Sequence, residues 1–145
     1  MILDASTDVA HLIQLSVAPV FLLTGVGSIL TVLINRLGRI VDRSRLLEKN
    51  LPISTDSERA AIHMELENLS TRATYINWSI SLSVLCALLV CSLIAALFIS
   101  AIVKVSMAEF VALLFIAAMF TLIGGLLCFL REIYIAIQNL RIGLH

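Results

Sequence analysis

The chain has 145 residues, of which 60% are hydrophobic and 14% are charged, and its mean hydropathy is +1.04. An apolar share this large exceeds what one small soluble core can bury, so the composition excludes an ordinary soluble domain and indicates an integral membrane protein. The formal net charge is zero, but seven of the ten basic residues lie between residues 36 and 72, after the first apolar run.

The first apolar run, residues 12–34, carries no charge and is long enough to cross a bilayer, because a spanning helix needs about 20 residues. We predict the first span over residues 9–34. Polar side chains recur at helical spacing in its second half: Thr24, Ser28, Thr31 and Asn35. In a bilayer such a row faces protein or water. Two interpretations are open: helix packing with the hydroxyls bonded to their own helix, or the lining of a water-filled path.

A charged stretch, residues 35–45, follows this run without a break and contains four arginines. Four residues of this stretch are predicted to form a charge ring on the cytoplasmic side: Arg36, Arg39, Asp42 and Arg43. Three interpretations stay open. The arginines anchor the topology by reaching lipid phosphates, Asp42 pairs with its arginine neighbours, or the ring stands at the mouth of a pore and attracts anions.

An apolar row runs through both segments in steps of four and three residues: Val26, Leu30, Leu33, Leu37, Ile40, Ser44 and Leu47. Such a heptad seam predicts one continuous helix from about Asp8 to Glu48.

Pro52 then breaks the helical pattern, and Thr55 with Glu58 forms a capping box for the next helix. A second seam follows: Ile62, Leu66, Leu69, Ala73, Ile76 and Ile80. Two helices that share one seam across a short break predict an antiparallel helical hairpin over residues 35–77.

Two further apolar runs predict a second span over residues 78–103 and a third over 108–130, followed by a helical tail over 131–145. The second span carries a ridge of small side chains at every fourth position: Ser79, Ser83, Ala87, Cys91 and Ala95. Small residues in register let another helix approach closely, so this ridge predicts helix packing. One face of the tail is apolar and is expected to pack on the hairpin: Ile133, Ile137, Leu140 and Leu144.

Charge predicts the orientation, because cytoplasmic loops of membrane proteins carry an excess of Lys and Arg. The hairpin and the carboxyl end are therefore expected in the cytoplasm, and the amino end outside. Three aromatic residues lie at the predicted cytoplasmic interface: Tyr75 and Trp78 at the start of the second span, and Tyr134 just past the third. Aromatic side chains favour the headgroup level.

Two stretches of this chain resemble a family of small bacterial membrane proteins, catalogued as domain of unknown function number 2721: Ala18-Pro19-x-Phe21-Leu22-Leu23-Thr24-Gly25 and Asn35-Arg36-Leu37-x-Arg39-x-x-Asp42-Arg43-x-Arg45. The resemblance covers nearly the whole chain. It implies a bacterial inner-membrane location, and it carries over no activity, cofactor or functional residue.

The residues show no pattern of catalysis, since no nucleophile, base and orienting group can converge. We expect no enzyme, no cofactor and no metal; the three cysteines lie inside apolar runs, where packing explains them. Nucleic acid is not an expected partner, because the basic residues of the hairpin are interleaved with acidic ones.

The predicted fold is all-α: a three-span transmembrane protein with a cytoplasmic antiparallel helical hairpin. Its partners are the lipid bilayer and copies of itself, because the seams and the small ridge provide more packing faces than one subunit can use. Two functions stay open. One is a channel-like homo-oligomer for ions or small solutes; the other is a non-conducting scaffold or regulatory subunit that binds an unknown partner protein through its cytoplasmic helices.

Overall fold

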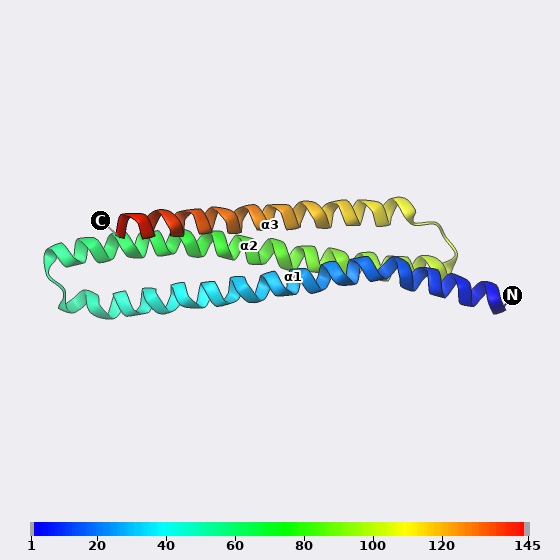
Figure 1. The fold of residues 1–145 in the computed structure, drawn as a ribbon, viewed down its shortest axis with the longest axis horizontal. Coiled ribbons are helices and arrows are strands. Elements are labelled where there is room, and N and C mark those ends of the chain that lie inside the picture. Colours follow the sequence, from blue (N-terminus) through cyan, green and yellow to red (C-terminus); the bar gives the residue numbers. More distant parts are fainter. Residues whose placement is uncertain (1, 144–145) are drawn as a thin grey trace. The chain divides into compact units, whose positions relative to one another are not determined.

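The computed structural model describes the backbone of residues 2–143 and the side chains of residues 9–138. Three long helices follow one another: α1 (Ile2–Asn50), α2 (Asp56–Val103) and α3 (Ala108–Gly143) (Figure 1). A short 3₁₀ helix, η1 (Leu51–Ile53), joins α1 to α2. Within residues 2–143 there is no strand, which confirms the all-α prediction.

Each of the three helices is long and apolar enough to cross a membrane. In the most apolar windows of α1, α2 and α3, only 17%, 28% and 17% of the residues are buried inside the chain. Most apolar side chains of these windows therefore face outward, where they need apolar surroundings. These properties are those of a multi-pass membrane protein.

Helix α1 runs through Pro19 and continues into the arginine-rich stretch, so the prediction of one unbroken helix is confirmed. The seam predicted along α1 is also confirmed. Val26, Leu33, Ile40 and Leu47 are buried, and the seam positions between them are partly buried.

The contacts divide the chain into two compact units. Unit 1 comprises Met1–Leu30 and Leu82–Ile123, so each of the three helices contributes to it. Its core is small and apolar, with one residue from α1 and two each from α2 and α3: Val26, Cys86, Val90, Ala118 and Leu122.

Unit 2 comprises Thr31–Ser81 and Gly124–His145, and it contains the predicted hairpin. The turn of this hairpin is well capped. The amide of Thr55 donates to Glu58 Oε2 at 3.3 Å, and the amide of Glu58 donates to Thr55 Oγ1 at 3.4 Å. This reciprocal pair confirms the capping box, which satisfies two amides that the first turn of α2 leaves without a helical partner.

Helix α3 passes through residues 131–143 without a break, so the predicted tail continues the third helix. The prediction that Ile137 packs on the hairpin is wrong, because Ile137 is exposed, while Ile133 is partly buried. Glu132 is the buried residue at this level, and Ile137 lies about 140° away from it around the helix. The side chains of Leu140 and Leu144 lie outside the described residues.

Lys104, which follows α2, has a φ of 61°, in the left-handed region that favours glycine. Lys104→Gly is therefore expected to raise the free energy of unfolding by roughly 0.5–1 kcal/mol, since only a residue with a Cβ is strained here. The thermal midpoint in detergent measures this. Lys104→Ala is the control and should give no gain, because it keeps the Cβ; an equal gain would trace the effect to the ammonium group instead.

Candidate functional site

Glu132 of α3 lies in unit 2 with a side chain that is 0% exposed. Arg36 of α1 donates from Nε and Nη2 to Glu132 Oε2, at 2.9 and 2.6 Å. Arg72 of α2 donates from Nε to Glu132 Oε1 at 2.9 Å. One carboxylate therefore binds an arginine from each of the other two helices. We call Arg36, Arg72 and Glu132 the Glu132 cluster.

The Glu132 cluster has two positive charges and one negative, so it carries a net charge of +1. Burying a carboxylate is costly unless it is paired and hydrogen-bonded. Both oxygens of Glu132 accept hydrogen bonds from arginines. The arginine side chains are 31% and 21% exposed, so each reaches from the interior to the surface. The Arg36 guanidinium also stacks over the ring of Phe129, 5.6 Å from its centroid, which adds a cation–π contact.

A second ion pair joins the arms of the hairpin, where Arg43 Nε donates to Glu65 Oε1 at 2.9 Å. Arg36 precedes Arg43 by seven residues on α1, and Arg72 follows Glu65 by seven residues on α2. Equal and opposite steps are the register of an antiparallel helix pair with a heptad seam. The Arg43–Glu65 side chains are 50% and 41% exposed, so this pair contributes at most about 1 kcal/mol.

The four residues of the predicted charge ring do not lie together. Arg36 belongs to the Glu132 cluster, and Arg43 is paired with Glu65. Arg39 and Asp42 are exposed, and neither takes part in the ion pairs found among the described side chains. Two arginines of the stretch therefore turn toward the other helices, and Arg39 turns outward.

The polar row of α1 faces away from the other helices of its own chain. In unit 1, Thr24 and Ser28 are exposed on the face opposite Val26, and their hydroxyls donate to the carbonyls of Val20 and Thr24 at 3.1 and 3.2 Å. In unit 2, Thr31 and Asn35 are also exposed.

The small ridge of α2 is buried at one end and exposed at the other. Ser79 in unit 2 is fully buried, and its hydroxyl donates to the carbonyl of Gly125 on α3 at 2.6 Å. In unit 1, Ser83 is buried, Ala87 is partly buried, and Cys91 and Ala95 are exposed. Residues four apart drift about 40° around a helix at each step, so a strict i+4 row cannot stay on one packed face.

A family model described as "Protein of unknown function (DUF2721)" matches residues 16–142. The chain belongs to this family. No curated protein and no solved structure matches it. The matched range of this DUF2721 chain contains the whole Glu132 cluster, the polar row and the small ridge.

The Glu132 cluster is not among the sites predicted from the sequence. Arg72 lies in the basic segment that predicts the orientation, and Glu132 follows the predicted third span. The signal in the DUF2721 sequence was a lone acid at the end of an apolar run, with an arginine at the corresponding end of each other run.

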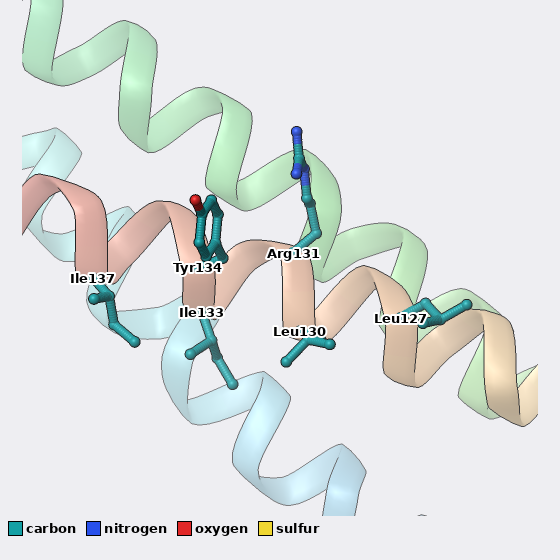
Figure 2. Close-up of a pocket in the computed structure, with 6 residues that line it drawn as sticks. All are labelled: Leu127, Leu130, Arg131, Ile133, Tyr134 and Ile137. Atoms are coloured by element: carbon teal, nitrogen blue, oxygen red, sulfur yellow. The ribbon is translucent and has the colours of Figure 1, made fainter.

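An open groove of about 530 Å³ lies on the face of α3 opposite Glu132. Its six lining residues all come from α3 (Figure 2): Leu127, Leu130, Arg131, Ile133, Tyr134 and Ile137. Arg131 and Tyr134 extend to one side of the helix, and Leu130 and Ile133 to the other (Figure 2). An apolar face with an arginine and a tyrosine is typical of a helix at a membrane interface. Among the described residues no group of three or more His, Cys, Asp or Glu could hold a metal ion.

Proposed function

We propose that this DUF2721 protein is a channel-like homo-oligomer that passes ions or small solutes across the bacterial inner membrane. The observation that carries the proposal is the direction of the polar row, which faces away from its own chain on a helix apolar enough to span a bilayer. In this proposal the protein is not an enzyme and needs no cofactor.

Support for the proposal is strongest at Asn35, whose side chain carries an amide and is exposed in unit 2. Thr31 and Asn35 lie on the face of α1 opposite the buried Leu33 and Ile40. The predicted span ends at residue 34, so in a monomer Thr31 would face acyl chains and Asn35 would lie at their cytoplasmic edge, where an amide without a partner is costly. A closed ring of copies that turns this face toward a common axis hydrates it.

The part of the polar row in unit 1 gives weaker support for a lining face. Thr24 and Ser28 are exposed on the corresponding face, but their hydroxyls donate to carbonyls of α1 itself. A hydroxyl that is satisfied within its helix tolerates lipid. Thr24 and Ser28 are therefore proposed as lining residues on their exposure alone, and Asn35 is the better test.

We place the hairpin and the end of α3 in the cytoplasm and the amino end outside. The basic residues of the hairpin support this orientation through the positive-inside rule. Trp78 and Tyr134 support the position of the interface, because both are exposed in unit 2 and aromatic side chains favour the headgroup level.

The test is ion flux into liposomes that contain the purified protein. The double change Thr31→Leu with Asn35→Leu is expected to lower the flux at least about tenfold, because a hydrophobic lining resists hydration. Ile34→Leu is the matched control: it changes an exposed apolar side chain on another face of α1 and should leave the flux unchanged. Native mass spectrometry establishes that each variant keeps the same oligomeric state.

Two results would contradict the proposal. One is a monomer in a bilayer-like environment. The other is wild-type flux that persists in the double variant, which would remove the proposed lining.

A second candidate is a non-conducting scaffold that binds a partner protein through the hairpin. The observation that favours it is the exposure of Ile53 and Met64, which are 84% and 73% exposed near the turn. Ile53 also lines an open groove of about 480 Å³ that includes Leu47 and Ile62. Exposed apolar side chains on a soluble segment often mark an interaction surface. An intact oligomer without flux in the liposome test would favour this candidate over the channel.

A further inference from the structure

We infer that the proposed path selects small anions, and that Arg39 is the side chain that sets this preference. The inference rests on the proposed function, and it names the class of solute for the same site.

Arg39 follows Asn35 by four residues, so it extends the row of Thr31 and Asn35 on the same face of α1. It is exposed, and no ion pair among the described side chains includes it. Arg36 and Arg43 lie about 60° and 40° away from Arg39 around the helix, and both are held by carboxylates of the other helices. Of the arginines of this stretch outside the ion pairs, Arg39 therefore lies nearest to Asn35, about 6 Å farther along the helix axis.

The Glu132 cluster adds to the positive potential at this level. Arg36 is the residue next to Asn35. The cluster has two arginines and one carboxylate, so its net charge is +1. Its groups are largely buried, so water and salt screen this charge less than a surface charge. An anion at Asn35 therefore meets two sources of positive charge, Arg39 and the Glu132 cluster.

Asp42 opposes this effect, because it is exposed and lies only about 20° from Asn35 around the helix. It is about 10.5 Å from Asn35 along the helix axis, against about 6 Å for Arg39, so its effect at Asn35 is the weaker of the two. The balance at the end of the polar row is therefore positive.

The experiment measures the reversal potential of the purified oligomer in a planar bilayer across a potassium chloride gradient. The wild-type protein is expected to favour chloride over potassium. Arg39→Gln should lower the chloride-to-potassium permeability ratio about fivefold, since each subunit loses one unit charge near the path, and Arg39→Glu should reverse the preference. Arg39→Lys keeps the charge and should keep the ratio, and Asp42→Asn should raise it.

Arg45→Gln is the matched control, because Arg45 is an exposed arginine that lies about 9 Å beyond Arg39 along the axis of α1. It should change the permeability ratio less than Arg39→Gln does. Each variant is compared with the wild type in oligomeric state before its currents are read.

The outcomes separate this inference from the proposed function. Currents that favour potassium, or neither ion, would overturn the inference and leave the channel in place. An anion preference that is unchanged in Arg39→Gln would overturn the role of Arg39. No current from an intact oligomer would overturn both.

Discussion

Glu132→Ala is expected to destabilise the protein by about 3–5 kcal/mol, because it leaves Arg36 and Arg72 near each other without the carboxylate that both bind. The loss is of this size because the charges left behind are only 31% and 21% exposed, and so cannot regain full hydration. The measurement is the free energy of unfolding in detergent, from chemical denaturation followed by circular dichroism.

The matched control for this change is Glu65→Ala, which removes the acid from an ion pair of similar geometry but high exposure. It should cost no more than about 1 kcal/mol. If the two variants lose equal stability, burial of the carboxylate does not determine the effect.

A further variant tests whether the intact Glu132 cluster stabilises the fold, or whether stability is lost only when one member is removed and the others are left unpaired. Replacing all three members together, Arg36→Met, Glu132→Leu and Arg72→Met, removes every charge and leaves none unpaired. Stability should return to within roughly 2 kcal/mol of the wild type, since a buried ion pair and an apolar replacement of similar volume are often close in energy. A triple variant as unstable as Glu132→Ala would show that the cluster itself contributes the stability.

The helices and their seams could be predicted because their signals are local. The steps of four and three residues from Val26 to Leu47 determine which face of α1 is apolar, and that face is the one that is buried. The capping box at Thr55 and Glu58 was predictable for the same reason, since its members are three residues apart.

The Glu132 cluster depends on information that a single sequence lacks. Its members are 60 and 96 residues apart, and they meet only because of how each helix is rotated about its axis. Charge counting assigns every arginine the same role in topology. The structure separates them, since Arg36 and Arg72 bind Glu132, Arg43 binds Glu65, and Arg39 faces outward.

The small ridge is buried over only part of its length, for a geometric reason. Its spacing of four residues matches the heptad seam over one or two steps and then departs from it. Ser79 and Ser83 are therefore buried, whereas from Cys86 onward the buried positions continue through Val90 and Leu93 instead.

Ser79→Leu is expected to destabilise the protein by about 3 kcal/mol, from roughly 1–3 kcal/mol of overpacking and about 1 kcal/mol for the lost hydrogen bond. Ser79 is fully buried, and its hydroxyl donates to the carbonyl of Gly125 at 2.6 Å, so the backbone of α3 is within reach of a short side chain. A leucine at this position can be accommodated only if α2 and α3 move apart.

Two further variants separate the parts of this effect. Ser79→Ala removes only the hydroxyl and should cost about 1 kcal/mol, because the space stays filled by a small side chain. Cys91→Leu changes a member of the same i+4 row that is exposed, and should leave the free energy of unfolding of the chain unchanged. If Ser79→Leu were as harmless as Cys91→Leu, the two helices would not be closely packed at Gly125. If Cys91→Leu left the chain folded but dissociated the oligomer, the exposed end of the ridge would be a contact between copies, and the small residues of α2 would pack within one subunit at Ser79 and between subunits at Cys91.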